Sequence, residues 1–433
     1  MLPLHAGLTA FVLMFGLLVL GVPIGFSMAI GGLSGMALII GFWPALGLFA
    51  TTAYESTVNY SLSIIPLFIL MGSIASRSGL SRELYKAFDT WIGSFRGGLA
   101  LATIGACGAF AAICGSSLAT AATMSKVALP EMRRFHYAES LATGAVAAGG
   151  VLGILIPPSV ILVLYGILTE TSIGDLFIAG FIPGILTIIG FMMAIAIMTR
   201  IWPDISRPGE RSTFGQKLQA LGQTWGVLML FALVIGGIYF GVFTPTEAAG
   251  VGAVGAFLIS AMRGRLTFVA IKEALLETVT TTSMIFMVLV GAITVNNLLI
   301  FSGLASAMSS FVAGLDVSPL AIIATILLIY LVMGCIFDSL AMILLTIPIF
   351  FPIVSSLGFD PVWFGILVVM VVELGLITPP IGMNVFVIKG MAPEIPLNTI
   401  YAGVLPFCVA QILLIVLIAL FPAIATWLPS TMK

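Results

Sequence analysis

Charged residues are scarce in this chain of 433 residues: they make up 8% of it, whereas hydrophobic residues make up 61%. A soluble domain carries about 25% charged residues, so the composition excludes an ordinary soluble fold. Lys and Arg number 16 against 17 Asp and Glu, and this near balance gives nucleic-acid binding no electrostatic basis. We therefore expect an all-α polytopic membrane protein.

Residues that carry enzyme chemistry are also few. The chain has two histidines, His5 and His136, which flank apolar segments, and four cysteines without CxxC spacing. An enzyme at membrane depth needs a nucleophile–base pair or a metal cluster, and no HExxH or GxSxG motif occurs. A channel needs a polar pore lining, which the apolar segments do not supply. We expect no enzyme and no cofactor.

One motif occurs twice: Leu152 to Pro158 reads LGILIPP, and Leu374 to Pro380 reads LGLITPP. Proline lacks the backbone N–H and clashes with the preceding turn, so each run should break a helix. Within hydrocarbon every unsatisfied backbone group costs several kcal/mol, so a break persists only against protein, ions or water. Matching breaks in two halves indicate the binding centre of a secondary transporter. We name these segments break one and break two.

The two halves of the chain repeat one order of motifs. Ser116-Ser-Leu-Ala119 corresponds to Asp338-Ser-Leu-Ala341, and the same spacing relates the two breaks. Each repeat should contain about five transmembrane helices and one re-entrant hairpin. The first repeat is predicted at residues 1–213, with a hairpin at about 98–132 and a broken helix at about 138–168; the second is predicted at residues 214–433, with a hairpin at about 320–356 and a broken helix at about 361–388.

The distribution of Lys and Arg predicts the orientation of the chain in the membrane. An odd number of crossings inverts the second repeat, and all of the 16 Lys and Arg except Lys126 and Lys433 then fall on one side. The positive-inside rule makes that side cytoplasmic, with both termini periplasmic. Straight crossings in place of hairpins would scatter these charges across both faces.

At each hairpin tip, one half-helix ends and the next begins. Loose carbonyls at the first end suit a cation and N–H groups at the second suit an anion, while hard cations such as Na⁺ take oxygen ligands. We name residues 114–117 tip one and residues 334–339 tip two. The sodium-site candidates are Gly115, Ser116, Ser117, Gly153 and Ile156 for tip one with break one, and Gly334, Asp338, Ser339, Gly375 and Thr378 for tip two with break two. An intramembrane carboxylate such as Asp338 is by default functional, whereas Gly-Ser-Ser alone often serves only helix packing.

Substrate candidates follow from the same helix ends. Ser116, Ser159 and Asn384 stand at new helix starts, where a carboxylate can be held. Lys126 is the one cation inside a hairpin; it either contacts substrate or extends to the interface. Glu373 precedes break two and is an ion ligand, a proton carrier or a partner for a buried donor.

The motifs GILIPPS, GSSxAT, FDSLAMILLTIPIFFPI and ELGLITPPIGMNVFV closely resemble those of the large membrane subunit of TRAP (tripartite ATP-independent periplasmic) transporters, and the resemblance covers the whole chain. It implies the ion-transporter type of fold, in which hairpins and broken helices form a mobile transport domain. The domain would move as an elevator driven by Na⁺ against a scaffold, here mainly residues 1–61 and 218–277.

The resemblance also implies partners, substrate and location. The partners would be a small four-helix membrane subunit and a periplasmic substrate-binding protein. The substrate would be an organic acid with a carboxylate, such as a dicarboxylate or a sialic acid, taken up through the bacterial inner membrane. The alternative is a stand-alone sodium/carboxylate symporter of related fold that works without a binding protein.

Overall fold

The computed structural model describes residues 3–209, 211–314 and 317–432. Throughout these residues the regular structure is helical, and no strand occurs among them. The two chain ends, residues 1–2 and Lys433, lie outside the described residues, so the predicted positions of the termini do too. The expected all-α architecture is confirmed.

The helices of the N-terminal half alternate with short Gly- and Pro-containing turns, as the sequence predicts. They are α1 (Pro3–Val19), α2 (Ile24–Ile40), α3 (Phe42–Val58), the 3₁₀ turn η1 (Tyr60–Ser63), α4 (Ile64–Arg77), α5 (Leu80–Ile92), α6 (Gly98–Cys114), α7 (Ser117–Arg134), α8 (Glu139–Leu155), α9 (Val160–Thr169), α10 (Ile173–Ile201) and η2 (Pro203–Ile205).

The C-terminal half continues in the same way. Its helices are α11 (Phe214–Gln223), α12 (Trp225–Phe231), the π-helical turn η3 (Ala232–Gly236), α13 (Gly237–Tyr239), α14 (Pro245–Met262), α15 (Phe268–Ser302), α16 (Leu304–Ala313), α17 (Pro319–Gly334), α18 (Ser339–Ser356), α19 (Pro361–Gly375), α20 (Met383–Met391), α21 (Leu397–Leu420) and α22 (Ala423–Ser430).

Seven helical stretches of the described chain are long and apolar enough to cross a membrane, or eight if the pair bent by 51° between α11 and α12 is one span. Further apolar helices, such as α6 and α17, are shorter. A hydrocarbon core about 30 Å thick needs about 20 apolar residues in a helix. The chain is therefore a multi-pass membrane protein.

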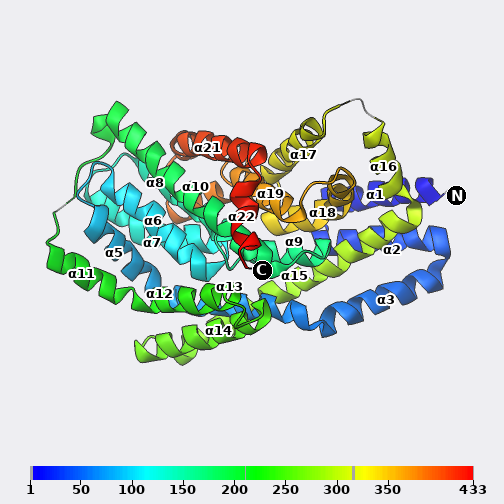
Figure 1. The fold of residues 1–433 in the computed structure, drawn as a ribbon, viewed down its shortest axis with the longest axis horizontal. Coiled ribbons are helices and arrows are strands. Elements are labelled where there is room, and N and C mark those ends of the chain that lie inside the picture. Colours follow the sequence, from blue (N-terminus) through cyan, green and yellow to red (C-terminus); the bar gives the residue numbers. More distant parts are fainter. Residues whose placement is uncertain (1–2, 210, 315–316, 433) are drawn as a thin grey trace.

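The helices form two groups that meet along α15 (Figure 1). In one group α15 packs along α2, with α1 and α3 beside them, and α4 packs on α14 and α15. In the other, α8 is surrounded by α6, α7, α10 and α21. The groups touch where α15 meets α18 and where α4 meets α6. Both predicted hairpins and both predicted broken helices lie in the second group.

Small residues allow the close approach of α2 and α15. A Cβ added at Gly32 would lie 2.8 Å from Cγ2 of Thr294, and one at Gly291 would lie 2.7 Å from the carbonyl oxygen of Gly25. In lipid, no hydrophobic effect drives apolar helices together, so close packing of this kind is a main source of helix association. The 35-residue helix α15 runs without interruption through residue 277, the predicted scaffold boundary.

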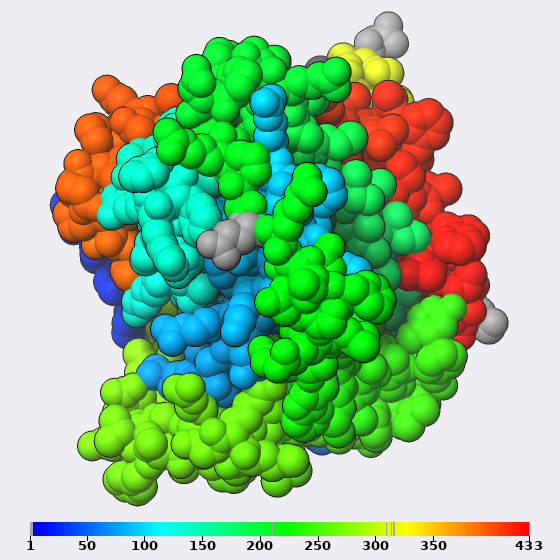
Figure 2. Space-filling model, turned by 90° about the vertical axis from the view of Figure 1, so that its left-hand side faces the viewer, coloured from blue at the N-terminus to red at the C-terminus, as the bar shows by residue number. Residues whose placement is uncertain are grey.

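The segment between α10 and α11 is held against the first half of the chain. The Tyr137 hydroxyl donates to the carbonyl of Arg207 at 3.0 Å and accepts from the amide of Leu99 at 3.3 Å. The amide of Gly209 donates to the carbonyl of Gly93 at 2.9 Å. Figure 2 shows this face, where the green segment crosses over blue and cyan parts of the first half.

Candidate functional site

Break one interrupts a helix in the buried interior of the protein. α8 ends at Leu155 and α9 begins at Val160, and every residue from 151 to 160 is buried. The Ser159 hydroxyl caps α9 by accepting from the amide of Leu162 at 3.3 Å. The predicted helix break is present, and it leaves backbone carbonyls that no helix uses.

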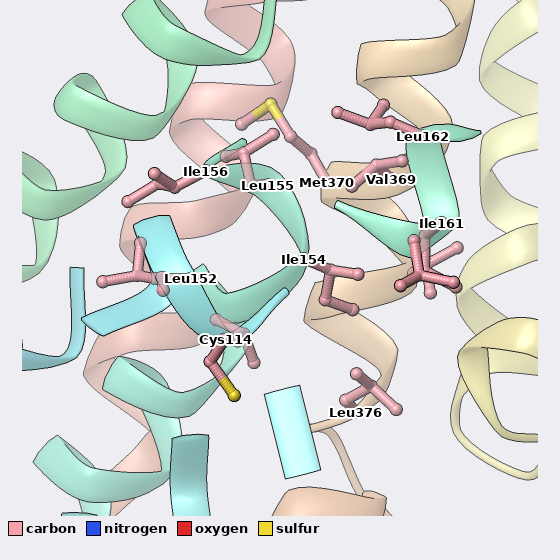
Figure 3. Packing of buried hydrophobic residues seen from close by; sticks show 14 of the residues in the cluster. Cys114, Leu152, Ile154, Leu155, Ile156, Ile161, Leu162, Val369, Met370 and Leu376 are labelled. Atoms are coloured by element: carbon pink, nitrogen blue, oxygen red, sulfur yellow. The ribbon is translucent and has the colours of Figure 1, made fainter. Parts of the chain in front are cut away.

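Tip one lies directly on break one. A Cβ added at Gly115 would lie 2.9 Å from the carbonyl oxygen of Pro158, and one at Gly153 would lie 2.5 Å from that of Ser116. Figure 3 shows Cys114 beside Leu152 at the same junction. Only glycine permits these backbone contacts, and Gly115 also has a positive φ of 64°. The structure thus brings four of the five candidates for this site together.

The oxygen atoms at this junction include one that the sequence analysis missed. The Thr120 hydroxyl oxygen is buried without a hydrogen-bond partner among the described residues, and it would lie 2.9 Å from a Cβ at Gly153. The Ser116 hydroxyl accepts from the amide of Ala119 at 3.4 Å and so caps α7. Because residues four apart share one face of a helix, the spacing of Ser116 and Thr120 could have indicated this hydroxyl.

Tip two meets break two in a similar way. A Cβ at Gly375 would lie 2.6 Å from Cα of Gly334, and the amide of Gly382 donates to the carbonyl of Cys335 at 3.4 Å. Asp338 caps α18, because its Oδ1 accepts from the amide of Ala341 at 2.6 Å. The carboxylate therefore satisfies a helix start.

Break two is more open than break one. Pro379 and Pro380 are exposed and Thr378 is half-buried, whereas Pro157 and Pro158 are buried. The Thr378 hydroxyl donates to the carbonyl of Leu374 at 2.6 Å, and its oxygen lies 3.8 Å from the Cys408 thiol. The Tyr401 hydroxyl lies 2.8 Å from the carbonyl oxygen of Pro380 and 2.7 Å from that of Ile381.

Both tips reach one pocket of about 240 Å³. Tip one lines it with Cys114 to Ser117 and tip two with Asp338 and Ser339. The opposite wall comes from α4 and α15 of the other helix group, and its polar residues are Ser73, Ser76, Glu277 and Thr281. Among the described residues that line the pocket, the charged ones are the carboxylates Glu277 and Asp338.

A polar network joins α4 to α15 at the edge of this pocket. Oε2 of Glu277 accepts from the Ser73 hydroxyl at 2.7 Å and from Nη2 of Arg77 at 2.9 Å. Arg77 also pairs with Glu273, and the Ser76 hydroxyl lies 3.2 Å from that of Thr123 on α7. The sequence analysis did not single these residues out, because their partners are distant in the chain.

Nine predicted residues lie outside the pocket lining: Gly153, Gly334, Gly375, Thr378, Glu373, Lys126, Ser159, Asn384 and Ile156. Lys126 is exposed on α7, and Ser159 is buried at the start of α9. Asn384 is buried and donates from Nδ2 to the carbonyl of Ala147 at 3.3 Å. Ile156 is buried against Gly184. The roles assigned to these residues from the sequence stay predictions.

Glu373 lies away from the tips. It is fully buried on α19, where the side-chain amide of Gln411 donates to its carboxyl oxygen at 3.4 Å.

Broken helices that meet hairpin tips within an apolar helical framework define a polytopic membrane protein of the secondary-transporter class. The model of one protein family matches residues 11–424, and that family is described as "Tripartite ATP-independent periplasmic transporter, DctM component". The chain belongs to this family and is a TRAP transporter large permease subunit.

Related proteins of the same family match nearly the whole length of this chain. The chain is 36% identical over 403 residues to the C4-dicarboxylate TRAP transporter large permease protein DctM of Pseudomonas aeruginosa, covering 92% of this chain and 93% of that protein. It is 32% identical over 416 residues to the sialic acid TRAP transporter large permease protein SiaM of Vibrio cholerae, covering 96% of each. It is 34% identical over 417 residues to the isethionate TRAP transporter permease protein DctMQ of Oleidesulfovibrio alaskensis, covering 95% of this chain and 65% of that longer protein.

A solved structure shares the fold. The Alcanivorax borkumensis YdaH transporter superposes with a TM-score of 0.65 over 88% of this chain and 89% of its own, at 15% sequence identity. At that identity the match concerns the fold alone.

Proposed function

We propose that this subunit carries a small organic anion across the bacterial inner membrane, coupled to Na⁺, after a periplasmic binding protein delivers the anion. The observation that carries the proposal is the 240 Å³ pocket in which both hairpin tips meet the other helix group. The relatives are named for C4-dicarboxylates, sialic acid and isethionate. These are small acids that carry carboxylate or sulfonate groups.

The charges of the pocket support coupling to a cation. Its charged lining residues among those described, Glu277 and Asp338, are both acidic. Glu277 is paired with Arg77 at 2.9 Å, so the lining carboxylate outside the ion pairs of the described chain is Asp338. Two like charges about 4 Å apart repel by roughly 4 kcal/mol at an effective dielectric constant of about 20, so an anion alone would bind poorly beside Asp338. The starts of α7 and α18 lie at the pocket and offer partial positive charge. A bound cation would supply the remaining positive charge that an anion needs.

The cation sites proposed here are the two junctions of tip and break. At the first junction the Ser116 carbonyl and the Thr120 hydroxyl both lie beside Gly153, and the Pro158 carbonyl lies beside Gly115. All three are oxygen ligands of the kind that hard cations take. At the second, Asp338, Ser339 and Thr378 provide the oxygens. Sodium bound at either junction would order the tip and so favour anion binding, a coupling free energy of about 1–3 kcal/mol.

The movement that we propose is an elevator motion of two inverted repeats, residues 1–213 and 214–433. The group containing α2, α4, α14 and α15 would be the scaffold. The hairpins α6–α7 and α17–α18, with the broken helices, would move across the membrane as one body and carry the pocket. Both termini would be periplasmic.

The proposed complex contains three proteins. A small four-helix membrane subunit would bind to this one, and a soluble periplasmic protein would deliver the substrate. A stand-alone symporter of related fold is the second candidate, because the tip and break sites alone do not require a binding protein.

Uptake by proteoliposomes tests both candidates. The chain and its small subunit are reconstituted, and labelled C4-dicarboxylate, sialic acid or isethionate is supplied with or without the cognate binding protein, under an inward gradient of Na⁺ or of K⁺. We expect uptake of one of these acids only with Na⁺ and the binding protein together. Uptake without the binding protein would favour the stand-alone symporter, and equal uptake with K⁺ would contradict sodium coupling.

A further inference from the structure

The short helix α11, in the segment between the two halves of the chain, presents an apolar stripe to its surroundings. The large apolar side chains of the helix recur at spacings of four and three residues, so they share one face. They are Phe214, Leu218 and Leu221, and they are 74%, 61% and 44% exposed. The stripe therefore points away from the protein.

A different face of α11 holds the helix in place against α5. Ala220 is buried on that face, and Nε1 of Trp91 on α5 donates to the carbonyl of Lys217 at 3.0 Å. The Lys217 ammonium also lies 5.8 Å from the centre of the Trp91 ring. Figure 1 shows α11 on the outer side of α5, at one end of the molecule. These contacts fix the outward direction of the stripe.

The side of α11 opposite the stripe is polar and uncharged. It carries Gln216, Gln219 and Gln223, all of them exposed. A helix that crossed the hydrocarbon core would have to bury these amides without partners, which is costly. A bend of 51° separates α11 from the helix that follows it. An amphipathic helix of this kind fits the boundary of the bilayer, where its apolar face sinks among the acyl chains.

Positive charge gathers where the chain enters α11. Arg207 and Arg211 stand on either side of Gly209, whose amide donates to the carbonyl of Gly93 at 2.9 Å, and Arg96 follows Gly93 by three residues. All three arginines are exposed. Among the described residues, none of the three takes part in an ion pair. Their charges are therefore available to an anionic partner.

The surrounding segments add to this excess. Residues 82–96 and 200–217 together hold seven Lys and Arg against four Asp and Glu. Glu83, one of these acids, is paired with Arg263. Three partly exposed tryptophans lie on or beside the same segments, as is typical of side chains at the level of lipid headgroups: they are Trp91, Trp202 and Trp225.

A phospholipid with a negative headgroup matches both features, because its acyl chains can cover an apolar stripe while its phosphate pairs with arginine. We propose that α11 and the arginines beside it form a binding surface for anionic phospholipids. Phe214, Leu218 and Leu221 insert among the acyl chains, and Arg96, Arg207 and Arg211 bind the headgroups. The surface anchors the segment between the two halves of the chain to the membrane.

Spin-label accessibility tests the position of the stripe. The chain and its small subunit are reconstituted in vesicles of phosphatidylglycerol and phosphatidylcholine, with a label at Leu218→Cys or, as the matched control on the polar side, at Gln219→Cys. The native cysteines are buried, and the unsubstituted protein gives the labelling background. We expect the label at position 218 to be accessible to O₂ and shielded from a water-soluble nickel complex, and the label at position 219 to show the reverse.

Two results of this experiment would overturn the proposal. A label at position 218 that is shielded from both reagents would show that protein, such as the small subunit, covers the stripe. A label at position 218 that is accessible mainly to the nickel complex would show that the stripe faces water.

Lipid titration tests recognition of the headgroup. Phosphatidylglycerol or phosphatidylcholine is added to the purified complex in detergent, and Tm is measured. We expect phosphatidylglycerol to raise Tm at lower concentration. One basic residue near an anionic lipid surface contributes about 1 kcal/mol, or about fivefold in affinity. The phosphatidylglycerol concentration for half of the rise should therefore increase about fivefold in Arg207→Gln and in Arg211→Gln.

Arg134→Gln is the matched control for the titration, because Arg134 is exposed but paired with Glu131 at 3.8 Å. Its titration should follow that of the wild type. Equal responses to the two lipids, or identical titrations of the control and the two arginine variants, would overturn the proposal. Neither experiment needs substrate or Na⁺, so both results are independent of the proposed transport function.

Discussion

At tip one, neutral oxygen atoms rather than charged groups are available to a cation. The Ser116 carbonyl and the Thr120 hydroxyl lie beside Gly153, and the Pro158 carbonyl lies beside Gly115. The Thr120 hydroxyl has no hydrogen-bond partner among the described residues. A hydrogen bond or ligand contact to a charge is worth about 1.5–3 kcal/mol. Removal of one such oxygen should therefore be measurable.

Thr120→Val removes the hydroxyl and keeps the side-chain shape. We expect the Na⁺ concentration for half-maximal uptake to rise about tenfold, which corresponds to about 1.4 kcal/mol. Thr103→Val is the matched control, because the Thr103 hydroxyl donates to the carbonyl of Leu99 at 2.8 Å within α6 and is not at the junction. If the two variants gave the same Na⁺ curve, Thr120 would not be a ligand.

Asp338 combines a structural role with a proposed ionic one, and two substitutions separate them. Asp338→Asn keeps an oxygen for the amide of Ala341, whereas Asp338→Ala loses the cap, which is worth about 1 kcal/mol. We expect both variants to lose Na⁺-driven uptake, and only the second to show a lower Tm. Asp360→Ala removes the corresponding cap of α19, which binds amides at 2.8 and 3.0 Å, and should retain uptake per folded molecule. Uptake by Asp338→Ala at the wild-type level would exclude Asp338 from the site.

At the scale of elements, function depends on how closely a hairpin can approach a broken helix. Glycines at the junctions have no side chain and leave room for backbone contact, as at Gly153 against Ser116 and at Gly375 against Gly334. The tip cannot move away from such a contact without losing the carbonyl from the site. The junction geometry is therefore sensitive to one added methyl group.

Gly153→Ala should displace tip one. Its Cβ would lie 2.5 Å from the Ser116 carbonyl oxygen, and overpacking of this kind costs about 1–3 kcal/mol. We expect a lower Tm in detergent and uptake reduced at least about tenfold. Gly16→Ala on α1 is the control, since nothing lies within 4 Å of its Cβ, and it should be neutral or stabilising. Equal uptake by the two variants would show that tip one tolerates a shift.

The segment between the two halves depends on one tyrosine hydroxyl. Burial raises the pKa of Tyr137 to about 12, and its hydroxyl bonds both Leu99 and Arg207. Tyr137→Phe leaves the Leu99 amide without this partner, at a cost of about 1–3 kcal/mol. We expect a Tm lower by several degrees and faster trypsin cleavage after Arg211, because the bond from Arg207 to Pro208 resists trypsin. Tyr60→Phe, at an exposed residue, should change neither; unchanged cleavage in Tyr137→Phe would show that other contacts hold the segment.

At the scale of the whole molecule, the sequence predicts features that depend on neighbouring residues of the chain. It does not predict contacts between segments that are distant in the chain. Proline breaks its own helix, so both breaks were predictable from local chemistry. The wall formed by Ser73 and Glu277 was not, because these residues meet only through packing of α4 on α15. Thr120 combines both situations. The helix face on which it lies was predictable, but the lack of a hydrogen-bond partner for its hydroxyl depends on how Gly153 packs against it.

The two helix groups meet at a pocket, and each group forms one part of its wall. The hairpin tips bring helix starts and oxygen ligands, while α4 and α15 bring hydroxyls and the Glu277–Arg77 pair. If the group with the hairpins moves as one body, it leaves that wall behind and exposes the pocket to the other side. The ions at the junctions would then decide whether the moving body carries substrate.

Direct binding of ²²Na⁺ to the purified chain with its small subunit tests this account most directly. We predict that the wild-type complex binds ²²Na⁺, that unlabelled Na⁺ but not K⁺ displaces it, and that Thr120→Val and Asp338→Asn each weaken binding. A folded wild-type complex that binds no ²²Na⁺, or two variants that bind it as tightly as the wild type, would contradict the assignment of the junctions as sodium sites.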